Sequence, residues 1–248
     1  MKKYLIVSGC SWGDPNFISA EHPDMDISWK MWPEILAKKL DMQLINLCKS
    51  GQGQEYIYST LIDTLQTMPI SQIGLMIPAW STAPRRDYQM SGFQTRKQLW
   101  TADQFDWRGC IEYWIDRSMR YYYTFQSIME LHRIPYRQIQ MVHLYTGYMW
   151  EQLKKRSGHP THEDNEDNLE GDDYLWKQEY KKMCKEQILN SPYYNKINKN
   201  FIDWDRVSIP SEVNRLGPNY VERISERDKH PNENGQKQIA ELIYDRLG

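Results

Sequence analysis

The chain has 248 residues, a formal net charge of −2 and a mean hydropathy of −0.78. This length suits one sizeable domain that buries its own core. The near balance of charges excludes a global field that would attract nucleic acid or an anionic membrane. No apolar run approaches the roughly 18 residues that a membrane span requires. We therefore expect partners other than nucleic acids and membranes.

The cysteines and the N-terminus bear on the compartment. Four cysteines, at positions 10, 48, 110 and 184, are widely spaced and form no C-x-x-C pair. In a chain of this size, the pattern favours reduced thiols over disulfides or a zinc site. The start MKKYLIVSGC resembles a signal peptide, but its apolar run covers only Tyr4 to Val7 and is too short. We expect a cytoplasmic protein whose first apolar run is a strand.

Short apolar segments alternate with segments of helical periodicity along the chain. The patterns predict strands at 3–7, 42–48, 73–80 (ending near Pro78), 136–145 and 200–205, and helices at 28–40, 51–66, 111–133, 174–189 and 232–248. Strands that alternate with helices predict a parallel sheet covered on both faces. The prediction is therefore one α/β domain over residues 1–248, a three-layer α/β/α sandwich around a five-stranded parallel sheet.

Two segments interrupt this alternation. Residues 81–110 are irregular and rich in aromatic side chains, which favours a well-packed insertion, with an aromatic-lined binding surface as the alternative. Residues 155–173 are polar and acidic and are expected to form a surface loop. Lys177 stands where a calcium loop would place its closing Glu, so the segment misses that spacing. His159 and His162 are commoner as solvated loop residues than as ligands, so we predict no metal.

In parallel sheets, functional sites form beyond the carboxyl ends of the strands. Three predicted strands end there in small or polar segments, at residues 9–11, 50–53 and 79–82. The loop at 225–235, before the last helix, adds a histidine and an acid. A serine, a histidine and an acid are the parts of a nucleophilic hydrolase, in which the serine attacks, the histidine takes its proton and the acid fixes the tautomer.

The order of these segments resembles the SGNH hydrolases, also called GDSL-like esterases or acylhydrolases. The first block of that family, a strand running into Gly-Asp-Ser, matches VSGCSWGD with Cys10 in place of Asp. The second, an Asn followed by a glycine five residues on, matches NLCKSG from Asn46 to Gly51. The last, an acid and His-Pro before the final helix, matches DKHPNENG. The resemblance covers the framework but not the 81–110 insertion.

The resemblance implies the SGNH hydrolase fold, which is flavodoxin-like, and a role for each matching residue. Ser11 is the implied nucleophile, His230 its base and Asp228 the partner of that base. The backbone N–H groups of Ser11 and Gly51 are the implied oxyanion donors. No metal or organic cofactor is implied.

Each residue alone has an ordinary structural interpretation as well. A serine at a strand end is usually a cap or turn residue, and Gly51 can simply begin a helix. Asn232 can serve only as an N-cap. Cys10 is expected to point away from Ser11, and His143 is expected to be a core residue.

The third block departs from the family, because IPAWSTAPRRD contains no Asn to serve as the third oxyanion donor. Ser81, Trp80 and Arg85 are the candidates to replace it. Losing one such donor costs about 100- to 1000-fold in rate. The last block departs too, because the acid is often three residues before the histidine and Arg227 stands there. Asp228 lies one residue closer, and Glu226 is the alternative.

The expected function is that of a serine esterase acting on an O-acyl ester, O-acetyl included, of a carbohydrate or other small molecule. The alternative is a catalytically weak or inactive module on the same fold, which binds glycans or forms part of a phage virion. A flavodoxin-like nucleotide binder would share the strand order, but the chain has no P-loop and that reading leaves DKHPN unexplained. The oligomeric state stays open. The reactivity of Ser11 separates the first two.

Overall fold

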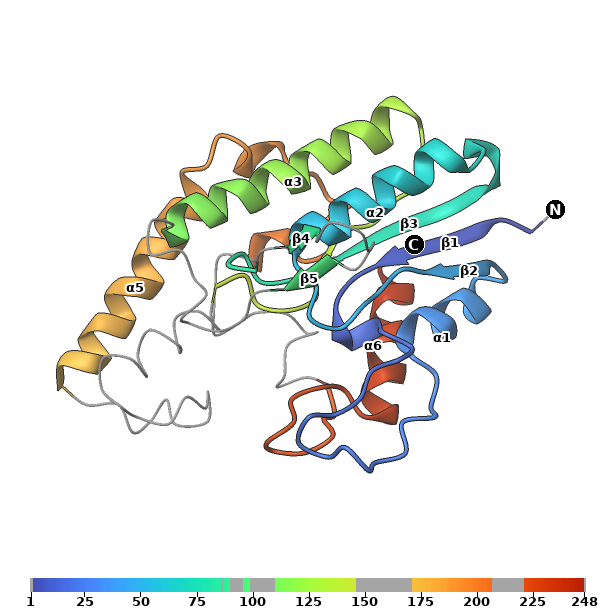
Figure 1. Cartoon of the computed structure of the whole chain (residues 1–248). Coiled ribbons are helices and arrows are strands. Elements are labelled where there is room, and N and C mark those ends of the chain that lie inside the picture. The colour runs from blue at the N-terminus through green and yellow to red at the C-terminus, as the bar shows by residue number, and fades with distance from the viewer. Residues whose placement is uncertain are drawn as a thin grey trace.

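Four parallel strands form the centre of the fold, in the order β2-β1-β3-β6 (Figure 1). The computed structural model describes residues 2–85, 87–89, 96–98, 110–145, 171–206 and 221–247. Within these ranges the strands of this sheet are β1 (Tyr4–Ser8), β2 (Gln43–Asn46), β3 (Ile73–Trp80) and β6 (Ile139–Gln140). The α/β class and the parallel sheet predicted from the alternating elements are confirmed.

Helices cover both faces of this sheet (Figure 1). The α-helices of the described ranges are α1 (Trp32–Lys39), α2 (Gln54–Thr67), α3 (Ile111–Leu131), α5 (Gly171–Leu189) and α6 (Glu233–Asp245). Leu5 and Val7 of β1 pack in the cluster formed with α1 and α6, whereas Ile6 packs in the cluster formed with α2, α3 and α5. This alternation follows from the two-residue period of a strand and produces three layers.

The prediction of a fifth strand at 200–205 is wrong. Phe201 makes a single parallel bridge to Gln138, through bonds of 2.8 Å from Gln138 N to Asn200 O and from Ile202 N to Gln138 O. Asp203 then takes a φ of 53°, a left-handed conformation that ends the extended chain. The chain continues as the 3₁₀ helix η6 (Trp204–Arg206).

Two strand boundaries also differ from the prediction. β3 continues through Pro78 to Trp80, because Ala79 and Trp80 still pair with Ile139 and Gln140 of β6. β6 is much shorter than the expected 136–145. Tyr136 adds only an isolated bridge to Met76.

The two interrupting segments lie largely outside the described residues. Within 81–110, the structure contains the antiparallel pair β4 (Asp87–Gln89) and β5 (Arg96–Gln98). Of the acidic loop predicted at 155–173, residues 155–170 are outside the described ranges, as are His159 and His162, and 171–173 belong to α5. In the part of the chain that the structure describes, no helix has the length and apolarity needed to cross a membrane.

The start of α6 is held in place by buried polar contacts. Asn232 caps the helix by accepting a bond of 2.9 Å from Gly235 N, as its position before the helix predicts. The buried Gln236 side chain accepts from Trp32 N at 2.8 Å and donates to Trp12 O at 3.1 Å. The loop before α6 is thereby fixed against the segment that follows β1.

Candidate functional site

Ser11 stands directly beyond the carboxyl end of β1, at the first position of the 3₁₀ helix η1 (Ser11–Gly13). Its hydroxyl oxygen lies 2.8 Å from Nε2 of His230. The two residues are 219 positions apart in the chain, so only the fold brings them together. The predicted serine and histidine are therefore within hydrogen-bond distance.

Asp228 completes a continuous chain of hydrogen bonds. Its Oδ1 lies 2.6 Å from Nδ1 of His230 and accepts the backbone N–H of the same histidine at 2.9 Å. An ionised carboxylate only accepts hydrogen bonds, so Nδ1 carries the proton of a neutral imidazole. Nε2 is then the acceptor for the Ser11 hydroxyl. Glu226, the alternative acid, is exposed to solvent.

The environment keeps His230 in its neutral form. Burial lowers the pKa of its imidazole, and the positive charge of Arg85 lowers it further, while Asp228 raises it. The net shift of the pKa is downward. The side chain nevertheless keeps 31% of its surface exposed, against 4% for Asp228. The histidine is therefore an unprotonated base near pH 7 that an external molecule can reach.

Asp228 stays ionised although it is buried. Burial raises the pKa of its carboxyl group, but bonds from Ser19 and His230 outweigh this, and the pKa lies below its ordinary value. Ser19 Oγ donates to Oδ2, so both carboxylate oxygens have donors.

The segment that matches the second block packs onto the segment after β1. Asn46 donates to Gly13 O at 2.8 Å, and both the backbone N–H and the hydroxyl of Ser50 donate to Asp14 Oδ2 at 2.6 Å. Gly51 follows with a φ of 79°, a conformation that glycine adopts without steric cost. Within the described ranges, no carbonyl or side chain accepts a hydrogen bond from the backbone N–H of Ser11 or Gly51.

The third segment brings Arg85 to the site and takes Trp80 away from it. The Trp80 ring is fully buried between β3 and α3, 5.0 Å from the ring of Tyr122, and its Nε1 donates to Gln138 Oε1 at 3.0 Å. The proposal that Trp80 lines the site is therefore corrected. It shares a strand face with Met76, which lies in the same core cluster.

Arg85 is a buried cation beside the candidate base. Its Nη1 donates to Ser81 Oγ at 2.6 Å and to Gln52 O at 2.9 Å. Burial lowers the pKa of the guanidinium, while its interactions with Cys10 and Asp87 raise it. Ser81 is buried, and its hydroxyl oxygen accepts a hydrogen bond from Arg85. It therefore bears on the site only by holding the side chain of Arg85.

The backbone around Arg85 is fixed by its neighbours. Arg117 of α3 donates to Arg85 O at 2.9 Å and to Ala83 O at 2.7 Å. A Cβ on Gly53 would lie 2.8 Å from Cβ of Arg85, so only glycine allows this approach. Asp87 accepts from Gly53 N and Tyr56 N, both at 2.7 Å, and so occupies the N-terminus of α2. The anion at that helix end is a side chain of the protein itself.

Sequence reasoning did not find three residues of the loop between η1 and α1. The ring centroids of Phe17 and His230 lie 4.2 Å apart. Ser19 contacts Asp228, and His22 Nε2 lies 2.8 Å from the hydroxyl of Ser225. The segment NFISAEH matches no motif, and only its position shortly after Ser11 could have drawn attention to it.

The structure also places the other residues that the sequence offered as nucleophiles, bases or metal ligands. Cys10 is buried, and burial raises the pKa of the Cys48 thiol, which makes Cys48 a poor nucleophile. Nδ1 of His143 accepts from Tyr145 N at 3.3 Å, and the two rings lie 4.7 Å apart. Among the described residues, no cluster of three or more His, Cys, Asp or Glu side chains is able to hold a metal ion.

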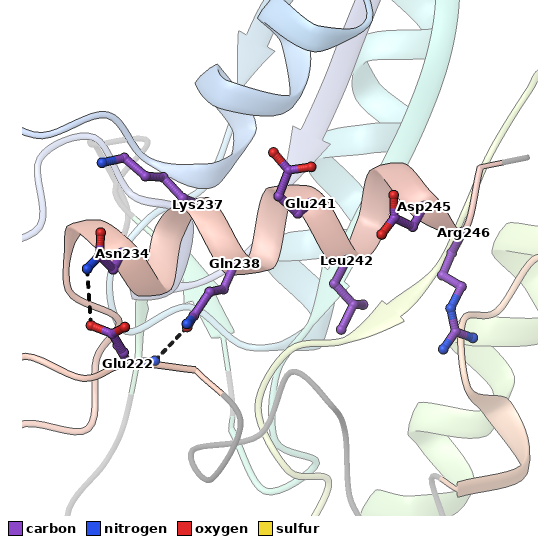
Figure 2. A pocket seen from close by; sticks show the side chains of 8 residues that line it. All are labelled: Glu222, Asn234, Lys237, Gln238, Glu241, Leu242, Asp245 and Arg246. Atoms are coloured by element: carbon purple, nitrogen blue, oxygen red, sulfur yellow. Dashed lines mark hydrogen bonds between the residues drawn. The ribbon is translucent and has the colours of Figure 1, made fainter.

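A groove of ≈ 600 Å³ runs along α6 and does not contain the site (Figure 2). Its side chains are largely engaged with neighbours. Asn234 donates to Glu222 at 3.3 Å, and Arg246 pairs with Asp203 at 2.8 Å. It is lined by Glu222, Asn234, Lys237, Gln238, Glu241, Leu242, Asp245 and Arg246.

No model of a protein family matches the sequence, and no curated protein matches it significantly.

Proposed function

We propose that the protein is an SGNH-type serine ester hydrolase that cleaves an O-acyl ester, with O-acetyl esters of carbohydrates or other small molecules as the first candidates. The observation that carries this proposal is the chain of contacts from Ser11 Oγ to His230 Nε2, at 2.8 Å, and from His230 Nδ1 to Asp228, at 2.6 Å. A serine, a neutral histidine and a buried carboxylate in this order are the parts of nucleophilic acyl transfer.

The reaction proceeds in two halves. Ser11 Oγ attacks the ester carbonyl carbon while His230 Nε2 takes its proton, and Asp228 stabilises the imidazolium at Nδ1. The bond to the alcohol oxygen then breaks, and His230 returns the proton to the departing alcohol. Water, deprotonated by His230, attacks the acyl-serine. The carboxylic acid leaves, and Ser11 regains its proton.

The oxyanion of each tetrahedral intermediate needs donors that are already in place. The backbone N–H groups of Ser11 and Gly51 serve this role, which the absence of other acceptors for them in the described ranges supports. Arg85 takes the place of the family's Asn. A cation next to His230 disfavours the imidazolium on its own, but a negative oxyanion formed beside both charges offsets that repulsion.

Labelling with a fluorophosphonate probe, followed by peptide mass mapping, tests the proposal. The expected result is label on Ser11 in the wild type and none in Ser11→Ala or His230→Ala. Ser28→Ala is the matched control, because Ser28 lies exposed on the surface and bonds only to Asp26 among the described residues. A panel of acetyl and longer acyl esters then identifies the substrate class. A folded wild type that takes no label would overturn the proposal in favour of a binding or structural module.

A further inference from the structure

The loop between η1 and α1 contacts the loop that carries Asp228 and His230, residues 225–232, which we call the acid–histidine loop. The contacts are made by alternate side chains. Phe17 packs on the ring of His230, and Ser19 donates to Asp228. Ile18 lies between them and is 72% exposed, which is what an extended segment produces when its neighbours face inward. His22 reaches Ser225, whose hydroxyl also accepts Asp228 N at 3.0 Å. One short segment therefore contacts each part of the turn that carries the base.

The proton of the Ser19 hydroxyl has one direction available. The side chain is 0% exposed, so water does not compete for it. Its oxygen already accepts the backbone N–H of His22 at 2.9 Å. A hydroxyl has a single proton, and this one points to Oδ2 of Asp228. Oδ1 is thereby left to face His230.

We propose that Ser19 is a positioning residue of the candidate active site, whose hydroxyl holds the Asp228 carboxylate in the orientation that aims Oδ1 at His230 Nδ1. This inference rests on the proposed function for its consequence in catalysis. The contact itself is independent of any reaction. Hydrogen bonds to charged groups are among the stronger ones in proteins, and a buried carboxylate oxygen that loses its donor is poorly stabilised.

The titratable and charged groups that face Asp228 come from three segments of the chain. His230 faces it from its own loop, and His22 faces it through Ser225 from the loop before α1. Arg85, from the segment after β3, acts on it by way of His230. Ser19 is an uncharged donor in this surrounding, so its removal changes no charge.

The test measures the pKa of Asp228 by carboxyl-carbon NMR in the wild type, Ser19→Ala and Ser19→Thr. We expect the pKa to rise in Ser19→Ala and to return toward the wild-type value in Ser19→Thr, which keeps the hydroxyl. Once a substrate is known, kcat should fall about 10- to 100-fold in Ser19→Ala with KM within about twofold. Ser28→Ala again serves as the control, since it removes a serine–aspartate contact on the exposed part of the same loop.

The outcomes separate the two proposals. An unchanged Asp228 pKa in folded Ser19→Ala overturns the positioning role, whatever the activity. If Ser19→Ala does not fold, Ser19→Cys keeps a side chain of similar size with a weak donor, and the same titration decides. A wild type in which Ser11 takes no fluorophosphonate overturns the proposed function, while the titration still decides the role of Ser19.

Discussion

The ring of Phe17 lies against the imidazole of His230, with centroids 4.2 Å apart and planes inclined by 35°. Burial is the main cause that lowers the pKa of His230. Phe17→Ala should admit water to the imidazole, so the pKa of His230 should rise toward its ordinary value of about 6.5. A histidine NMR titration measures this. Phe17→Leu keeps an apolar cover and should shift the pKa less, and equal shifts in the two variants would contradict the explanation.

Arg85→Gln should slow the reaction of Ser11 with a fluorophosphonate by about 100- to 1000-fold, the cost of losing one oxyanion donor. It should also raise the pKa of His230, because it removes a positive charge that lowers it. Arg85→Lys keeps the charge and should retain the low pKa while losing part of the rate. A rate in Arg85→Gln that matches the wild type would remove Arg85 from the oxyanion site.

Asp87→Ala should destabilise the fold by about 1–2 kcal/mol, in the range of a lost helix cap. Its carboxylate accepts two backbone N–H groups at the start of α2, from Gly53 and Tyr56. Urea unfolding measures the loss, and Asp87→Asn should lose less because its amide oxygen still accepts. Asp26→Ala, at an exposed aspartate, should change the stability by no more than about 0.5 kcal/mol.

Gly235→Ala should destabilise the fold by about 1–3 kcal/mol, the usual cost of overpacking. An added Cβ would lie 2.1 Å from Glu222 O, and this backbone is tied to Asn232 by a bond of 3.0 Å. Gly74→Ala is the comparison and should cost less, because its Cβ would meet the movable thioether of Met42 at 2.8 Å and Cβ of Lys3 at 2.9 Å, and no atom as close as Glu222 O. Thermal unfolding compares the two. Comparable losses of stability in the two variants would argue against close packing of α6 on the segment that contains Glu222.

His143 should make the protein sensitive to acid. Burial lowers the pKa of its imidazole from 6.5 to about 3, and Lys181 contributes to the same shift. Below pH 6.5 His143 becomes protonated in the unfolded chain, whereas in the folded protein it stays neutral down to about pH 3. The free energy of unfolding therefore falls as the pH drops through this range. His143→Gln should therefore flatten the stability curve between these values.

Urea unfolding at several pH values tests this, with His132→Gln at an exposed histidine as the matched control. Identical slopes for His143→Gln and the wild type would contradict the assignment.

The sequence by itself determined the class of fold and the three strands that lead to the site. Continuous apolar runs such as YLIV and helical periodicity such as that of residues 111–133 are local properties, and they predict elements without knowledge of the partners. The positions of Ser11, Gly51 and His230 beyond strand ends and before the last helix followed from the same alternation, because the carboxyl ends of parallel strands share one edge.

Only the tertiary structure decided which neighbouring side chains face that edge. Asp228 rather than Glu226 meets His230, because the turn places one carboxyl inside and leaves the other in solvent. Arg85 rather than Trp80 acts on His230, through its charge, since the two-residue period of β3 turns the indole of Trp80 into the core.

The contacts of Phe17 and Ser19 were also beyond local reasoning. They join residues more than 200 positions apart, Ser19 and Asp228 being 209 positions apart, and no local pattern encodes such pairs. The fifth strand failed for the same reason, because a strand exists only where a neighbour supplies a ladder, and β6 offers two residues.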